Sequence, residues 1–233
     1  MFLKFIKCSE SRNNMRHLAF VFVASVFLQI AAQASAESIL YIGDSHTAGN
    51  FGSHLEALLK ADGASVTRTG IVGSRAPAWS APKGLSQLQK TESYSAVIIA
   101  LGTNDLASFC RNPSAAVKDA IDLLTKVKPE QKCIWVGPPL LSASHLLKEC
   151  GGEPGMQKFR EAYKAGIEGR GCQYVDSSKS LIYPNSTDGV HFSGKAAERW
   201  AQYIYTQISD SLKPESKSTP TVQQPQQKTK VFQ

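Results

Sequence analysis

Three short apolar segments constrain the fold of this chain more than any other feature of its sequence. They cover residues 39–42, 97–101 and 134–136, and each is continuously apolar rather than alternating. A continuous apolar run of this length is typical of a strand buried on both faces of a parallel sheet. Two weaker runs, residues 65–69 and 173–175, fall at matching intervals. We therefore expect five parallel strands.

Helical patterns fill the intervals between these strands. They cover residues 55–61, 113–127, 156–168 and 193–212. Local signals support their ends, because Asn112 precedes a proline at a helix start and Gly63 follows the first helix as a stop. Strands alternating with helices predict the α/β class. The expected architecture is a three-layer α/β/α sandwich with a five-stranded parallel sheet in the flavodoxin-like order 2-1-3-4-5.

The first 36 residues have the composition of an export signal. Four basic residues precede an apolar run at residues 18–32, and Ala-Ser-Ala at 34–36 is typical of a cleavage site. An uncleaved membrane anchor is the alternative, but the run is shorter than the roughly 20 residues that a spanning helix needs. We expect cleavage after Ala36, export to the periplasm or the medium, and no stable membrane insertion afterwards.

Composition divides the remaining chain into one domain and a tail. Residues 37–212 are enough for one core, whereas residues 213–233 are rich in Pro, Gln, Ser, Thr and Lys and are expected to be disordered. Most of the formal net charge of +7 falls in the export segment and the tail. The nearly neutral domain has no basic stripe with interleaved aromatic residues, which argues against a nucleic-acid partner.

Four cysteines remain after the export segment is removed, an even number that favours two disulfides in an oxidising compartment. In the predicted strand order, Cys133 and Cys172 begin adjacent strands at one end of the sheet. Cys110 and Cys150 lie in loops at the other end, about 17–20 Å away. We therefore predict the pairs Cys133–Cys172 and Cys110–Cys150. No cysteine or histidine spacing suggests a metal site.

Four polar motifs follow predicted strands or precede the last helix. They are GDSH at 43–46, TGIVG at 69–73, GTND at 102–105 and DGVH at 188–191. Any one of them could be an ordinary turn or helix cap. The carboxyl ends of parallel strands, however, lie at one edge of the sheet, where open α/β sheets place their binding sites.

The residue types in these motifs suit nucleophilic catalysis. His191 could take the proton of the Ser45 hydroxyl, and Asp188, three residues before it, could orient the imidazole ring. The Asn104 amide could donate to an oxyanion, and Gly73 could offer its backbone N–H.

Taken in their order along the chain, the four motifs resemble the SGNH (GDSL-like) hydrolase family over roughly residues 38–210. The resemblance implies Ser45 as nucleophile, His191 as base and Asp188 as its orienting partner. It also implies an oxyanion hole made by the N–H groups of Ser45 and Gly73 and the Asn104 side chain, with no cofactor. Two residues depart from the pattern: His46 stands where many members have leucine, and Arg68 where an asparagine is frequent.

These features predict a monomeric, exported serine esterase that removes small acyl groups, such as acetyl, from an envelope or environmental polysaccharide. His46 and Trp79 are candidate substrate contacts, although either could instead pack inside the domain. An O-acyltransferase is an alternative. A lipase-like enzyme is another, in which the four leucines at 140, 141, 146 and 147 would line an acyl groove, although a short helix folded over the core is the favoured interpretation of these leucines. The alternative outside enzymes is a glycan-binding module without activity.

Overall fold

The five strands of the computed structural model form one parallel sheet, as predicted. Their bounds are Ser38–Gly43 (β1), Ser65–Gly70 (β2), Ala96–Ala100 (β3), Lys132–Val136 (β4) and Gln173–Val175 (β5). The order across the sheet is β2-β1-β3-β4-β5, which confirms the expected topology. Because all five strands are parallel, their carboxyl ends lie at the same edge of the sheet.

The structure describes residues 37–82, 84, 86, 94–142 and 144–213. The expected export signal, residues 1–36, lies outside this part of the chain, and so does the tail apart from Lys213. Both therefore stay predictions.

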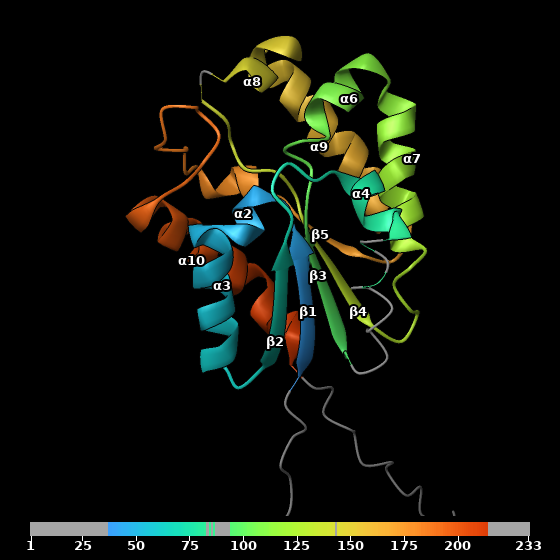
Figure 1. Ribbon diagram of the computed structural model, residues 1–233, viewed down its shortest axis with the longest axis vertical. Coiled ribbons are helices and arrows are strands. Elements are labelled where there is room, and N and C mark those ends of the chain that lie inside the picture. The colour runs from blue at the N-terminus through green and yellow to red at the C-terminus, as the bar shows by residue number, and fades with distance from the viewer. Residues whose placement is uncertain (1–36, 83, 85, 87–93, 143, 214–233) are drawn as a thin grey trace, which may run out of the picture. The chain divides into compact units, whose positions relative to one another are not determined.

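Helices cover both faces of the sheet (Figure 1). On one face lie α3 (Asn50–Ala61) and α10 (Gly194–Leu212), whose buried side chains pack against alternate strand residues such as Ile39 and Tyr41. On the other face lie α7 (Pro113–Leu124) and α9 (Glu153–Glu168), packed against Leu40 and Ile42. Successive residues of a strand point to opposite faces, so a continuously apolar strand fills two cores. The predicted three-layer sandwich is confirmed.

Within the described residues, four short helical segments have no counterpart in the sequence analysis. They are α2 (Ser45–Ala48), α4 (Ala76–Ser80), α6 (Leu106–Arg111) and the 3-10 helix η3 (Ser177–Ser180). Each is too short to show a repeat of the 3.6-residue period in the sequence. The short helix expected at the loop leucines is α8 (His145–Glu149). Helix α4 lies in a segment for which the sequence analysis predicts no helix or strand, and α3 begins earlier than the predicted start at residue 55.

The register of the sheet aligns the ends of three strands. Gly43, the last residue of β1, pairs with Gly70 of β2 on one side and with Ala100 of β3 on the other. The chain segments that follow these three residues therefore leave the sheet at one level. They contain Ser45, Gly73 and Asn104.

The cysteines lie as the strand order predicted. The Cα atoms of Cys133 and Cys172 are 4.7 Å apart, and those of Cys110 and Cys150 are 5.4 Å apart. Both distances fall in the range of about 4.4–6.8 Å that disulfides occupy. That the two pairs are oxidised in the protein stays a prediction.

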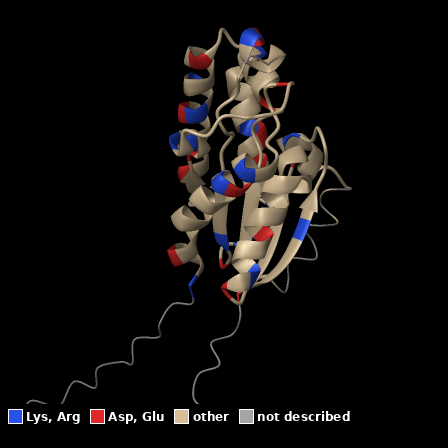
Figure 2. Ribbon diagram, turned by 90° about the vertical axis from the view of Figure 1, so that its left-hand side faces the viewer, with Lys and Arg blue, Asp and Glu red and all other residues tan. Residues whose placement is uncertain are grey.

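Charged residues of both signs are interspersed along the helices in Figure 2, and that view of the described residues shows no basic stripe. Among the same residues, no helix combines the length and the apolar character needed to span a membrane.

Candidate active site

Ser45 lies where the chain turns from β1 into α2. A side chain at Gly43 would collide with the Thr47 hydroxyl and with the Ala100 carbonyl, so only glycine allows this tight exit from the sheet. The Asp44 carboxylate then caps α2 by accepting a hydrogen bond from the His46 N–H at 2.9 Å. These contacts hold the Ser45 backbone while its side chain stays partly accessible.

Two hydrogen bonds in series, here called the relay, join the side chains of Ser45, His191 and Asp188. Ser45 Oγ lies 2.9 Å from His191 Nε2, and His191 Nδ1 lies 2.6 Å from Asp188 Oδ2. A carboxylate only accepts hydrogen bonds, so Nδ1 carries a ring proton, and in the neutral form of the ring Nε2 is free to accept from the serine hydroxyl. The sequence motifs at 43–46 and 188–191 are thus brought together at hydrogen-bond distance.

The loop that carries His191 is organised by Asp188. Its Oδ1 atom accepts from the backbone N–H of Val190 at 2.8 Å and of His191 at 3.0 Å. The hydrogen bond from the His191 ring, and then those from these two N–H groups, hold the pKa of the Asp188 carboxyl well below its usual range. Asp188 is therefore ionised at neutral pH, the state in which it can stabilise an imidazolium.

Asn104 lies between the loops that follow β1 and β2. Its Nδ2 atom donates to the Ser74 carbonyl at 3.1 Å and lies 3.5 Å from Asp44 Oδ2. Gly73 adopts φ +74°, a conformation that favours glycine. Ser74 follows Gly73, and Asp44 precedes Ser45. The three expected oxyanion donors therefore belong to one cluster of contacts at the edge of the sheet.

His46 points into the protein rather than into solvent. It is 5% exposed, and its ring packs against Trp200 and Phe192 with centroid distances of 5.1 and 5.9 Å. Burial lowers the pKa of His46 to about 3, so the ring is neutral. Burial likewise raises the pKa of the neighbouring Asp44 to about 7. The suggestion that His46 contacts substrate is wrong, and the packing interpretation replaces it.

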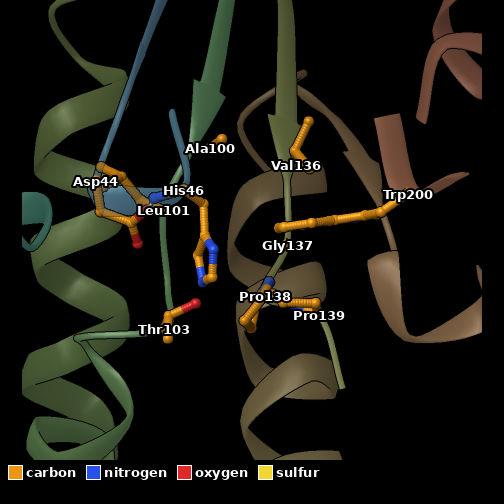
Figure 3. A pocket seen from close by; sticks show the side chains of 10 residues that line it. All are labelled: Asp44, His46, Ala100, Leu101, Thr103, Val136, Gly137, Pro138, Pro139 and Trp200. Carbon is orange, nitrogen blue, oxygen red and sulfur yellow. Dashed lines mark hydrogen bonds between the residues drawn. The ribbon is translucent and has the colours of Figure 1, made fainter. Parts of the chain in front are cut away.

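A cavity of about 10 Å³ lies beside this histidine, enough for a single water molecule. In Figure 3 the His46 ring points toward Thr103 and Pro138, which line the same cavity. The cavity is too small to hold an acyl chain.

Trp79 is also buried. Its side chain is fully buried on α4, and its indole N–H donates to Ser74 Oγ at 3.1 Å. A ring enclosed in this way cannot stack on a sugar, so the predicted substrate contact is wrong for Trp79. Its partner Ser74 was not singled out in the sequence, although it directly follows the TGIVG motif.

Two of the four leucines proposed to line an acyl groove are buried in the core, and the other two are partly buried against it. Leu140 and Leu141 are 6% and 3% exposed, and Leu146 and Leu147 on α8 pack against the same core cluster as Leu141. Within the described residues, no group of His, Cys, Asp or Glu side chains is arranged to bind a metal ion.

A family comparison places the chain in a known class of enzyme. The model of the GDSL-like Lipase/Acylhydrolase family matches residues 41–199, which is more than half of the chain and includes all four motifs. The chain belongs to this family. This GDSL-like protein is accordingly an enzyme that hydrolyses ester bonds. No curated protein sequence matches it.

Solved structures share the fold of this GDSL-like enzyme. An aryl esterase from M. smegmatis has a TM-score of 0.62 at 24% identity, and a carbohydrate acetylesterase from Sinorhizobium meliloti has 0.62 at 21%. Each match covers 75% of this chain and 99% of the other. An acetylxylan esterase from Geobacillus stearothermophilus has 0.60 at 20%, covering 75% and 94%. At these identities the likeness concerns the fold.

Proposed function

We propose that this GDSL-like enzyme is an exported serine esterase that removes acetyl or similarly small acyl groups from a polysaccharide. The observation that carries the proposal is the relay from Ser45 through His191 to Asp188, with distances of 2.9 and 2.6 Å. Both lie in or at the edge of the range of about 2.6–3.2 Å expected of a working nucleophile and base.

In the proposed reaction Ser45 Oγ attacks the ester carbonyl while its proton passes to His191 Nε2. The ionised Asp188 stabilises the imidazolium, which then returns the proton to the departing alcohol oxygen. A water molecule, deprotonated by the same ring, attacks the acyl-enzyme and releases the acid and Ser45.

The negative charge on the carbonyl oxygen requires donors that are already in place. We assign this role to the backbone N–H groups of Ser45 and Gly73 and to Asn104 Nδ2. The register supports the assignment, because Gly43, Gly70 and Ala100 are paired and the three donors follow these residues. Fixed donors of this kind stabilise the transition state without reorganisation.

The names of two similar structures support the histidine and aspartate roles and the substrate class. One of them is a carbohydrate acetylesterase, and the other is an acetylxylan esterase. Catalytic variants of the acetylxylan esterase replace an aspartate and a histidine three positions apart, the spacing of Asp188 and His191 here. The burial of Leu140 and Leu141, and the packing of Leu146 and Leu147 against the same core, further favour a small acyl group over a lipid chain.

Export is proposed on the composition of residues 1–36 and on the two cysteine pairs within disulfide range. Secretion of the mature chain, with its new N-terminus at Glu37, would be detected by mass spectrometry of periplasmic and culture fractions. Retention of the full-length chain in the cytoplasm would contradict this part of the proposal.

Hydrolysis of p-nitrophenyl esters of increasing chain length tests the reaction. We expect the highest kcat/KM with acetate, followed by release of acetate from acetylated xylan or peptidoglycan. Preference for octanoate would favour the lipase-like alternative, and transfer of acetate to added sugar would favour an acyltransferase. No turnover would indicate a binding module.

Labelling with a fluorophosphonate identifies the nucleophile. Ser45→Ala should abolish labelling and turnover, whereas Ser114→Ala, at an exposed serine on α7, should change neither. A Ser45→Ala protein that is still labelled would place the nucleophile elsewhere.

A further inference from the structure

We propose that Trp79 and Ser74 form a buried clasp that positions the oxyanion donors, with Trp79 acting as a positioning residue. The proposal rests on the function proposed above and adds two residues that the sequence motifs do not identify. It replaces the earlier expectation that Trp79 binds substrate.

Ser74 is the centre of the clasp. Its Oγ atom accepts from Trp79 Nε1 at 3.1 Å and donates to the Gly43 carbonyl at 3.3 Å. Its carbonyl accepts from Asn104 Nδ2 at 3.1 Å, and its N–H donates to the Ile71 carbonyl at 3.0 Å. One serine thereby contacts segments from three strand ends.

These contacts connect all three proposed donors. Gly43 immediately precedes the turn that presents the Ser45 N–H, and its carbonyl also accepts from the Ile71 N–H at 2.9 Å. Gly73 is covalently joined to Ser74, and the Asn104 amide is bonded to it. A rotation of the Ser74 side chain would therefore break one of the two hydrogen bonds that hold this loop to the Gly43 carbonyl, and would leave only the one from the Ile71 N–H.

Burial explains why the Ser74 hydroxyl keeps this orientation. Ser74 is 5% exposed and Trp79 is fully buried, so no solvent competes for their hydrogen bonds. The indole N–H can only donate, which leaves the serine hydroxyl proton for Gly43. The rigid indole therefore determines which way the hydroxyl points.

A second hydrogen bond holds the start of α4, the helix that carries Trp79. Asp105, the neighbour of Asn104, accepts from the Ala76 N–H at the start of α4 through its Oδ1 atom at 3.1 Å. The helix that carries Trp79 is thus tied to the segment that carries Asn104. The Gly73 loop lies between these two attachments, and its donor is held in place before a substrate arrives.

Preorganisation of this kind affects the transition state more than the bound substrate. Trp79→Phe removes the indole donor and keeps an aromatic ring, and Ser74→Ala removes the hydroxyl. Displacement of oxyanion donors by a fraction of an ångström should lower kcat for p-nitrophenyl acetate by about ten-fold, with KM nearly unchanged. Ser74→Ala should have the larger effect, because it removes both hydrogen bonds.

Inhibition by phenylboronic acid separates positioning from stability. This compound forms a tetrahedral adduct with a reactive serine, so its affinity should fall by the same factor as kcat in both variants. The matched control is Trp135→Phe. Trp135 is also fully buried and donates its indole N–H at 3.1 Å, but to the Leu101 carbonyl. We expect this control to lower the thermal stability similarly while keeping kcat and boronate affinity.

Amide hydrogen exchange measures how firmly the clasp holds the Gly73 loop, and it does not require turnover. Trp79→Phe should speed exchange of the Ile71 N–H, which bonds to the Gly43 carbonyl, and of the Ser74 N–H, which bonds to the Ile71 carbonyl, relative to the Trp135→Phe control. An inactive wild-type enzyme would refute the proposed function, but the exchange rates would still test whether the clasp orders this loop. Unchanged exchange, or a loss of kcat and boronate affinity equal to that of the control, would overturn the inference.

Discussion

His191 Nε2 lies 2.9 Å from Ser45 Oγ, although the two residues are 146 positions apart in the chain. The serine is held by the turn after β1, and the histidine by a loop just before α10. The alignment therefore depends on the sheet, on the packing of α10 against α3, and on the contacts of His46 with Phe192 and Trp200. Substitutions that keep this framework and change single groups therefore give the sharpest tests.

Asp188→Asn should lower kcat by about 10³–10⁴ with little change in KM. The amide keeps the size of the carboxylate but can present its N–H₂ group to His191 Nδ1, which favours the wrong tautomer and removes the charge that stabilises the imidazolium. Steady-state kinetics with p-nitrophenyl acetate measure the change. Asp210→Asn, at an exposed aspartate on α10, is the control. A kcat within three-fold of wild type would exclude the proposed role of Asp188.

Asn104→Ala should lower kcat by about 10²–10³, the usual effect of losing one oxyanion donor. The folded fraction should remain high because Asn104 is only partly buried. Asn112→Ala is a useful comparison, since Asn112 caps α7 through the Ala115 N–H at 3.2 Å and its loss should cost about 1 kcal/mol of stability. If both variants had the same kcat, Asn104 would not belong to the oxyanion hole.

His46→Leu should change how stability depends on pH. The pKa of His46 is lowered from 6.5 to about 3, so the unfolded chain binds a proton at this site more readily than the folded protein. Stability from the neutral ring is complete above pH 6.5 and is lost as the pH falls toward 3. Wild type should therefore lose a few kcal/mol relative to the leucine variant over this interval.

Urea unfolding at pH 7, 5.5 and 4 measures this difference. The raised pKa of Asp44 acts in the opposite direction, because protonation of a buried carboxyl favours the folded state at low pH. Asp44 is present in both proteins, so its contribution largely cancels in the comparison. His145→Leu, at an exposed position, is the control. A difference between wild type and His46→Leu that is independent of pH would show that the ring is not buried and neutral.

Non-reducing peptide mapping should find Cys110–Cys150 and Cys133–Cys172 peptides. Each bond would close a loop with a sequence separation of 40 or 39 residues. In the chain-entropy model such a loop contributes about 4 kcal/mol to stability. Cys110–Cys150 joins α6 to α8 close to the Asn104 segment, so mild reduction should affect activity before global folding. A Cys110–Cys133 or Cys110–Cys172 peptide would refute the pairing.

Much of the fold could be predicted because its signals are local. The apolar runs at β1, β3 and β4 identify buried strands by composition alone, and the strand order then places the cysteine pairs. The relation between Asp188 and His191 is local as well, because a three-residue turn brings the two side chains together. The short helices α4 and α6 could not be predicted, because so few residues carry no periodic pattern.

The sequence by itself determined the strand order, the motifs and the residue types available for acyl transfer. Only the tertiary structure decided which polar and aromatic side chains face the solvent. His46 lies within the GDSH motif and Trp79 six residues after the TGIVG motif. Both are nevertheless buried, because α10 covers His46 and the packing of α4 encloses Trp79. Ser74 contacts Gly43 and Asn104 across 31 and 30 positions of the chain. Contacts between residues so far apart leave no local pattern, because they exist only once the sheet has aligned the strand ends.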